Sequence, residues 1–86
     1  MSDPQILANP DPVKQGAALQ VIYIFPEGGT VAHLTVTFDR DGEDVVEHLV
    51  ILTGDLPAVS VPADALGCLI QDDSGAAIDC AVTVIP

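Results

Sequence analysis

The sequence predicts an all-β domain, built as a small sandwich of two antiparallel sheets, from three observations. Segments rich in Val, Ile, Leu and Thr alternate with clusters of Gly, Pro and Asp about every eight to twelve residues, the spacing of strands in sandwiches and barrels. The period of about 3.6 residues that marks an amphipathic helix is nearly absent. The chain has 86 residues, enough for one domain. We therefore expect residues 1–86 to form a single domain, with a flexible tail over residues 1–4.

The N-terminal half of the chain predicts strands over residues 5–9, 17–25 and 30–38. The first is followed by Pro10 and Pro12, and proline cannot donate a hydrogen bond to a sheet. This strand should therefore lie at a sheet edge and break or change sheets at the prolines. The second strand ends at a Pro-Glu-Gly-Gly turn.

The segment over residues 30–38 alternates most regularly between apolar and polar residues. Successive side chains of a strand point to opposite faces of the sheet, so every second residue should point into the core. We expect this inward set to comprise Ala32, Leu34, Val36 and Phe38.

The C-terminal half predicts strands over residues 45–53, 56–61, 68–71 and 78–85. An Asp-Gly pair between two apolar runs is the strongest short-range signal for a hairpin, and Asp41 and Gly42 form such a pair. The strands on either side of it should therefore pair with each other. Pro57 favours an edge position for the strand that contains it.

Three groups of turn residues occur in a recognisable order. Residues 10–16 precede the first long strand, residues 61–67 form a Val-Pro-Ala-Asp-Ala-Leu-Gly corner, and an Asp-Ser-Gly turn at residues 73–75 precedes the last alternating strand. This order resembles that of bacterial and phage immunoglobulin-like domains over residues 10–85. The resemblance implies a small immunoglobulin-like β-sandwich, and it bears on fold rather than on function. The chain departs from antibody domains because it has no Trp and because its two cysteines are close in sequence.

The chain is strongly acidic. It has 13 Asp and Glu residues against only Lys14 and Arg40, which gives a formal net charge of −11. Nucleic acid is excluded as a direct partner because its binding depends on Lys and Arg that neutralise phosphates, and an anionic membrane surface is disfavoured for the same reason. No run of ~18 apolar residues predicts a transmembrane segment, and no signal peptide is predicted. We expect a protein that works in a virion or outside a cell.

Cys68 and Cys80 are the only cysteines, and they lie six residues on either side of Ser74. If Ser74 is the centre of a regular hairpin, the two cysteines face each other across neighbouring strands and point inward. Two interpretations remain open, a pair of buried free thiols or a cross-strand disulfide. A metal or redox site would need further ligands, and no second cysteine pair is present.

Two groups of side chains contain residue types that can bind metal ions. His33 and His48 should lie near each other across the hairpin, with Glu47 close by, and could bind a transition metal; alternatively they are exposed strand residues that happen to be neighbours. The acidic turn over residues 39–44 could bind calcium weakly, but its spacing differs from an EF-hand and a solvated hairpin turn explains it better. We expect no metal and no cofactor.

Catalytic residues are not evident. Ser2, Ser60 and Ser74 lie in a tail, an edge strand and a turn, and none has the surroundings of a nucleophile elbow. We therefore expect that the chain is not an enzyme.

Two predicted strands are apolar on both faces, although a sandwich strand ordinarily has one polar face. One face fills the core, and the other must be covered by another chain or domain, or within the same subunit by the N-terminal segment with Ile6 and Leu7. The residues concerned are Val21, Ile22, Tyr23, Ile24, Leu49, Val50, Ile51 and Leu52.

These observations favour a non-enzymatic structural subunit that self-associates as a homo-oligomer or protein assembly, such as a virion decoration or shell protein or a filament subunit. The alternative is an immunoglobulin-like carbohydrate- or protein-binding module of a larger secreted protein. A carbohydrate-binding module would require exposed aromatic residues, and aromatic residues make up only 3% of the chain.

Overall fold

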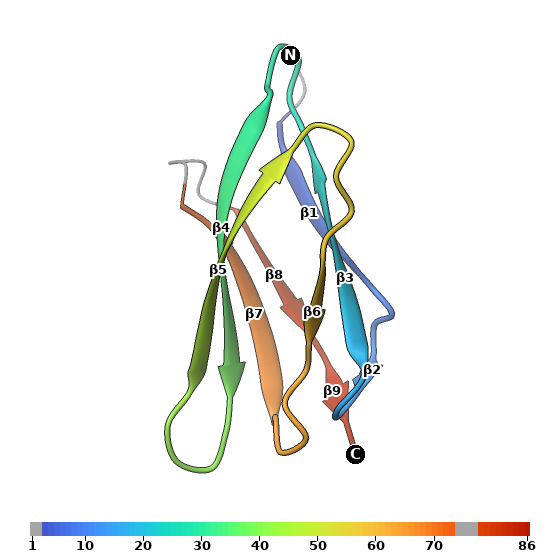
Figure 1. Ribbon diagram of the computed structural model, residues 1–86, viewed down its shortest axis with the longest axis vertical. Helices are drawn as coiled ribbons and strands as arrows, with labels where there is room; N and C mark the ends of the chain where they lie inside the picture. The colour runs from blue at the N-terminus through green and yellow to red at the C-terminus, as the bar shows by residue number, and fades with distance from the viewer. Residues whose placement is uncertain (1–2, 74–77) are drawn as a thin grey trace.

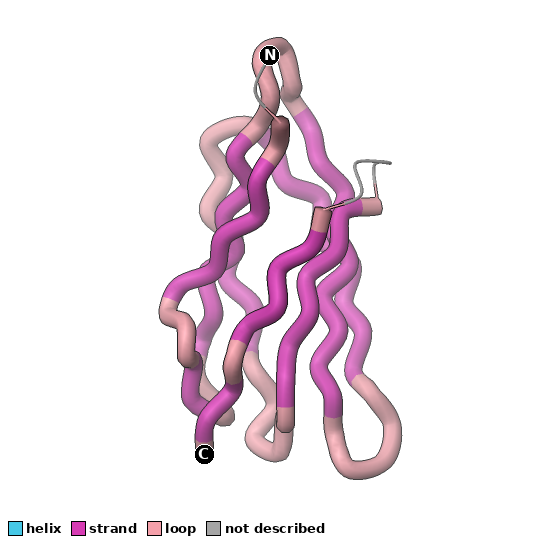
Figure 2. Tube along the Cα trace, turned by 180° about the vertical axis from the view of Figure 1, so that it is seen from behind, coloured by secondary structure: helices cyan, strands magenta, loops and turns pink. Residues whose placement is uncertain are grey.

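The computed structural model describes residues 3–73 and 78–86, and within these residues every regular element is a β-strand (Figure 1). The strands run along the long axis of a molecule that measures 39 × 21 × 17 Å (Figure 2). They are β1 (Gln5–Asn9), β2 (Val13–Lys14), β3 (Ala18–Ile24), β4 (Val31–Asp39), β5 (Val45–Leu52), β6 (Ala58–Ser60), β7 (Gly67–Asp72), β8 (Asp79–Val82) and β9 (Val84–Ile85).

The strands form two main layers. The first is a three-stranded antiparallel sheet in the order β1-β3-β6, and the second is a four-stranded antiparallel sheet in the order β5-β4-β7-β8. On one side of the molecule a short parallel pair, β2 with β9, links the chain that leaves β1 to the chain that leaves β8. On the other side, β5 and β6 are the outermost strands of their sheets.

The hydrophobic core lies between the two layers. Leu19 and Val21 on β3 belong to the same core cluster as Leu34 and Phe38 on β4, and all four side chains are fully buried. The four inward residues expected on the third strand, Ala32, Leu34, Val36 and Phe38, are each 0% exposed, which confirms the alternation there. Because the large aromatic residues are few, most of the remaining core consists of Val, Ile and Leu.

The expected hairpin around the Asp-Gly pair is confirmed, since β4 and β5 pair in antiparallel register from Phe38 opposite Val45 to Val31 opposite Leu52. Gly42 has φ of +115° in this turn, a conformation that other residues rarely adopt. The two strands expected at edges, β1 and β6, are both edge strands.

One expected strand is divided. The sequence predicts continuous pairing over residues 78–85, but β8 ends at Val82 and β9 begins at Val84. At Thr83, between them, the backbone N–H donates to Asp11 Oδ1 at 3.1 Å and the carbonyl accepts from the N–H of Val13 at 2.9 Å. The chain therefore leaves β7 and joins β2, because a segment 70 residues away in sequence supplies its hydrogen-bond partners.

Candidate interaction surface

The outer face of the four-stranded sheet is the surface on which exposed apolar side chains are most concentrated. On β5, Val46, Val50 and Leu52 are 51%, 61% and 54% exposed, and on β4, Val31 is 47% exposed. Val31 lies directly opposite Leu52 in the sheet. We call these four residues the outer apolar stripe. Because each side chain is about half exposed in one subunit, it retains apolar area that a partner can bury.

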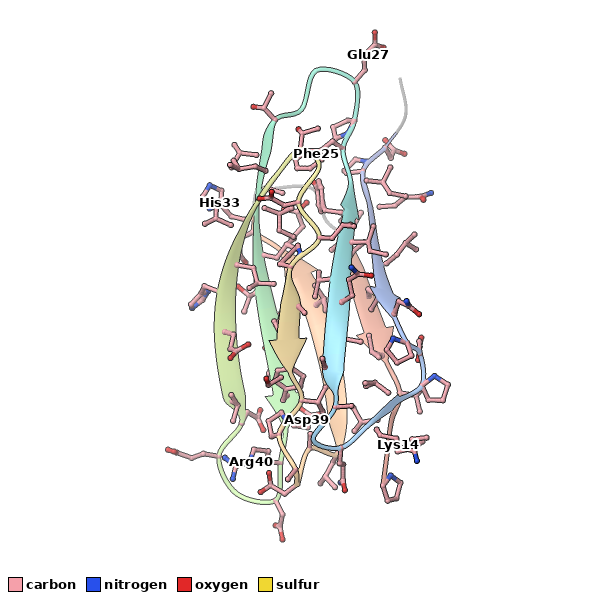
Figure 3. All side chains as sticks on the ribbon, turned by 45° about the vertical axis from the view of Figure 1, so that its right-hand side comes forward. Lys14, Phe25, Glu27, His33, Asp39 and Arg40 are labelled. Carbon is pink, nitrogen blue, oxygen red and sulfur yellow. The ribbon has the colours of Figure 1, made fainter. Side chains whose placement is uncertain are left out.

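Acidic residues are absent from the outward positions of β5 and from those of β4 before Asp39. The outward residues between the valines and leucine of the stripe are His33, Thr35, Thr37 and His48. Acidic residues lie at the ends of the molecule, with Glu27 at one end and Asp39 beside Arg40 at the other, while His33 lies on the outer side of β4 (Figure 3). They also lie on the β7–β8 side of this face, where Asp73 bonds to Thr35 and Asp79 is opposite Gln71. In a chain of net charge −11, the β5 side of this face is therefore a place where a second molecule meets little negative charge.

The backbone of β5 is also open along one edge. The N–H of Leu52 donates to Asp55 Oδ2 at 3.1 Å and its carbonyl accepts from the N–H of Asp55 at 2.9 Å, so both groups point away from β4. Thr53, the next residue, donates instead to Thr30 on the β4 side at 3.2 Å. Because backbone groups alternate along a strand, Val46, His48 and Val50 direct their N–H and C=O groups to the same outer edge as Leu52.

A groove separates this edge from the neighbouring edge of the other sheet. It has a volume of about 490 Å³ and is lined by Glu47, His48 and Leu49 on β5 and by Ala58, Val59 and Ser60 on β6. Glu47 lies opposite Val36, an inward position, and is half-buried. A charge that points inward on an edge strand discourages indiscriminate strand pairing, so this carboxylate limits which partners the edge can accept.

A polar cluster lies on the outer face beside the stripe. The Thr35 hydroxyl donates to Asp73 Oδ2, and His48 Nδ1 lies 3.3 Å from the same hydroxyl oxygen. Because the single hydroxyl proton is directed to Asp73, the hydroxyl oxygen can only accept a hydrogen bond from the imidazole N–H. The imidazole therefore cannot act as a base towards Thr35, and the cluster does not have the arrangement of an activated nucleophile.

The three candidate metal ligands predicted from the sequence do not form one set, although the two histidines are neighbours as expected. His33 lies opposite Val50 and His48 lies opposite Thr35, so the two imidazoles are diagonal neighbours on the outer face. Glu47 is on the opposite face of the same sheet. Over residues 3–73 and 78–86, no group of three or more His, Cys, Asp and Glu side chains is placed to hold a metal ion.

The cysteine register predicted from the sequence is wrong by two residues. Cys68 lies opposite Val82, and Cys80 lies opposite Ile70, because the hairpin is centred one residue later than Ser74, which itself lies outside the described residues. Both thiols are free, with Cys68 buried and Cys80 half-buried. Burial, together with the nearby Cys80, raises the pKa of the Cys68 thiol to about 11, and burial raises the pKa of Cys80 as well. Both thiols are therefore protonated at neutral pH and unreactive.

The eight apolar residues considered from the sequence are divided between core and surface. Val21 and Ile51 are fully buried and are corrected to core positions, and Tyr23 and Leu49 are half-buried against the core. Val50 and Leu52 belong to the outer apolar stripe.

The remaining two, Ile22 and Ile24, lie on the outer face of the three-stranded sheet. Ile24 is 43% exposed and Ile22 is half-buried opposite Leu7 of β1, which is itself 46% exposed. The N-terminal segment therefore sends Ile6 into the core and leaves Leu7 on the surface, so it does not cover this face. The exposed residues that the sequence predicted for self-association therefore lie on two opposite sides of the molecule.

Two members of the stripe, Val31 and Val46, are not among the surface residues predicted from the sequence. Alternation alone assigns Val31 outward, because Ala32 is the first inward residue of β4. Val46 could have been found from its spacing of four residues from Val50, which keeps both on one face of a strand.

Comparisons with known proteins do not extend this description. No family model matches the chain, and neither a curated protein nor a solved structure matches it. In the part of the chain that the structure describes, no helix is long and apolar enough to cross a membrane.

Proposed function

We propose that this chain is a non-enzymatic subunit of a protein assembly, with an immunoglobulin-like β-sandwich fold, that self-associates through the outer face of its four-stranded sheet. The observation that carries the proposal is the outer apolar stripe, which lies where the outward positions of β5, and those of β4 before Asp39, hold no acidic residue, in a chain of net charge −11. Two copies that approach through any acidic end would repel each other, whereas this part of the face allows contact at low electrostatic cost.

The connectivity supports the immunoglobulin-like part of the proposal. The orders β1-β3-β6 and β5-β4-β7-β8 correspond to the A-B-E and C′-C-F-G sheets of such domains, and the first segment changes layers through the β2–β9 pair. Departures from antibody domains remain, since no tryptophan is present and the two thiols are free.

The energetics make association through the stripe reasonable. Fully burying a Val or Leu side chain contributes about 1.5–3 kcal/mol. About half of that area is already buried in each stripe residue, so four of them would contribute about 3–6 kcal/mol before the loss of association entropy is subtracted. Such a contact is weak on its own and becomes effective when many copies associate, as in a virion shell or decoration layer or in a filament.

The non-enzymatic part of the proposal is supported by the chemistry of the described side chains. The Thr35 hydroxyl is committed to Asp73, both thiols have raised pKa values, and the groove between β5 and β6 holds only one acidic side chain, Glu47. Nucleophilic catalysis needs a hydroxyl or thiol that can be deprotonated, and these contacts and pKa shifts favour the protonated forms of Thr35 and of the two thiols.

The test is the mass of the protein in solution, measured by light scattering across a concentration series. We expect masses above the 8.9 kDa of one chain that rise with concentration, and an ordered assembly by electron microscopy at the highest concentrations. Val50→Asp should give a folded monomer because it places a charge in the contact. The matched control is Ile24→Asp, which adds the same charge on the opposite face and should leave association unchanged. A protein that remains monomeric at millimolar concentration contradicts the proposal.

A binding module is the second candidate, and the groove between β5 and β6 is the observation that favours it. Its carbohydrate-binding form is less well supported, because Phe38 is buried and Tyr23 packs edge-to-face on Phe25 with ring centroids 4.8 Å apart, so the aromatic rings do not form an exposed platform. A monomer in the light-scattering experiment that binds an extended peptide along this groove would favour this alternative.

A further inference from the structure

We propose that the contact proposed above is made at the β5 edge of the outer face, where β5 of one copy pairs antiparallel with β5 of a second copy about a twofold axis at His48. The two four-stranded sheets then become one continuous sheet. This inference rests on the proposed function and names the partner and the geometry of contact.

The first argument is that β5 is the edge best suited to pairing. It is eight residues long and contains no proline. By contrast, β6 is only three residues long and is flanked by Pro57 and Pro62, and β1 lies between Pro4 and Pro10. The fourth edge, β8, is four residues long and gives way to β9, which is paired with β2. Proline and shortness both protect edges from pairing, so β5 is the least protected of the four.

The second argument is that the edge hydrogen bonds select a register. Asp55 already occupies both edge groups of Leu52, so the open edge is limited to Val46, His48 and Val50. A twofold pairing that uses all three and avoids Leu52 places Val46 opposite the partner subunit's Val50, and His48 opposite the partner subunit's His48. Three such pairs exchange about six backbone hydrogen bonds.

The third argument is that the side chains are compatible in this register. On the outer face, each Val46 meets a Val50, so two half-exposed apolar pairs are covered. On the inner face, Glu47 lies opposite the partner subunit's Leu49. A shift that moved the twofold axis to Glu47 would place two carboxylates opposite each other, which is unfavourable. The inward Glu47 is therefore compatible with a twofold axis at His48 and opposes a twofold axis at Glu47.

The charge distribution adds a signature that separates this partner from others. Antiparallel pairing brings the acidic turn with Glu43 and Asp44 of one copy towards Asp55 of the other. These like charges repel, and salt screens the repulsion. Association of two copies along β5 should therefore strengthen with salt, whereas a basic peptide on the same edge would bind more weakly as salt is added.

The test is oxidative cross-linking of single cysteine variants in the full chain. His48→Cys places two thiols opposite each other at the axis, with Cα atoms about 5.5 Å apart, within disulfide range. Val50→Cys is the matched control, because its partner position is Val46. The native thiols are buried or half-buried, so the unmodified chain should not cross-link. We expect at least ten times more covalent dimer from His48→Cys than from Val50→Cys, and the combined variant Val46→Cys with Val50→Cys should restore the yield.

The outcomes separate this inference from the proposed function. Equal yields of covalent dimer from the two single variants would overturn pairing through β5. Association that weakens as salt is raised from 50 to 500 mM, which shortens the Debye length by roughly threefold, would overturn it as well. An oligomer by light scattering that His48→Cys fails to cross-link overturns the edge geometry and leaves the assembly proposal standing. A monomer under all conditions overturns both.

Discussion

At the scale of single residues, Tyr23 and Cys68 show how position alters chemistry in a small core. Tyr23 is the penultimate residue of β3 and lies on its inner face, and its hydroxyl donates to Asp72 Oδ2 at 2.7 Å. Burial first, and then the hydrogen bond to Asp72 and its negative charge, raise the pKa of Tyr23 to about 12. The neutral phenol is thus favoured in the folded state.

Alkaline titration tests this shift. Tyr23 is the only tyrosine, so absorbance near 295 nm reports on it alone. Because the folded-state pKa is raised above 10.0, the associated stability is complete below pH 10 and is lost as the pH rises from 10 towards 12. We expect a midpoint near 12 in the folded protein. Asp72→Asn should lower the midpoint without restoring 10, because burial is the largest cause. A midpoint of 10 with unchanged circular dichroism would contradict the contact.

The Cys68 thiol provides a second test at this scale. A rise of its pKa from 9.0 to about 11 lowers the thiolate fraction at pH 8 by about 100-fold. Modification of the folded protein by a thiol-specific disulfide reagent should therefore be slow, and denaturant should release both thiols to rapid reaction. Rapid reaction of one thiol without denaturant would show that Cys80, the less buried of the two, is more accessible than its position implies.

At the scale of elements, β5 is an edge strand of the four-stranded sheet, with one edge bonded to β4 and the other open. Residues 45, 47, 49 and 51 direct their backbone groups to β4, whereas 46, 48 and 50 direct theirs outward. Proline substitutions distinguish the two sets, since proline is tolerated on an edge only where its missing N–H would face solvent.

We expect Val50→Pro to fold, with a loss of about 1–2 kcal/mol from local strain, and to lose association. Leu49→Pro should be at least about 3 kcal/mol less stable, because it removes a hydrogen bond to β4 and disturbs a side chain packed against the core. Chemical denaturation and light scattering measure the two effects. Equal destabilisation by both substitutions would show that the alternation along β5 is assigned wrongly.

At the scale of the whole molecule, the dominant feature is unbalanced charge. Only one ion pair is found among the described residues, in which Arg40 donates from Nε and Nη2 to the two carboxylate oxygens of Asp64 at 3.0 and 2.9 Å. This contact raises the pKa of Arg40 and lowers that of Asp64, and it ties the β4–β5 turn to the corner before β7. The other carboxylates repel one another across the surface.

Added salt should therefore stabilise the fold. Raising sodium chloride from 20 to 500 mM shortens the screening length from roughly 20 to 4 Å, which weakens the repulsion among acidic residues. We expect the midpoint of thermal unfolding to rise by about 5 °C or more. The measurement uses the variant Val50→Asp, which we expect to be monomeric, so that association does not contribute to the shift. Lys and Arg are too few for screening of attractive pairs to offset this gain. A midpoint that is independent of salt would contradict the argument.

The sequence by itself determined the features that depend on neighbours along the chain. Alternation assigned the inward residues of β4 up to Phe38, and the Asp41–Gly42 pair predicted the β4–β5 hairpin, because strand periodicity and turn conformation are local properties. It also identified β3 and β5 as apolar on both faces, although it could not assign which set faces outward.

Only the tertiary structure decided the features that depend on distant segments. Ile51 rather than Val50 faces the core because β4 sets the register of β5, and Cys68 lies diagonal to Cys80 because β7 and β8 pair with Cys68 opposite Val82. The break at Thr83 exists because Asp11 and Val13 bind it from the other end of the chain. The open edge at Val46, His48 and Val50 likewise follows from β5 being the last strand of its sheet, and strand order depends on the packing of the whole chain.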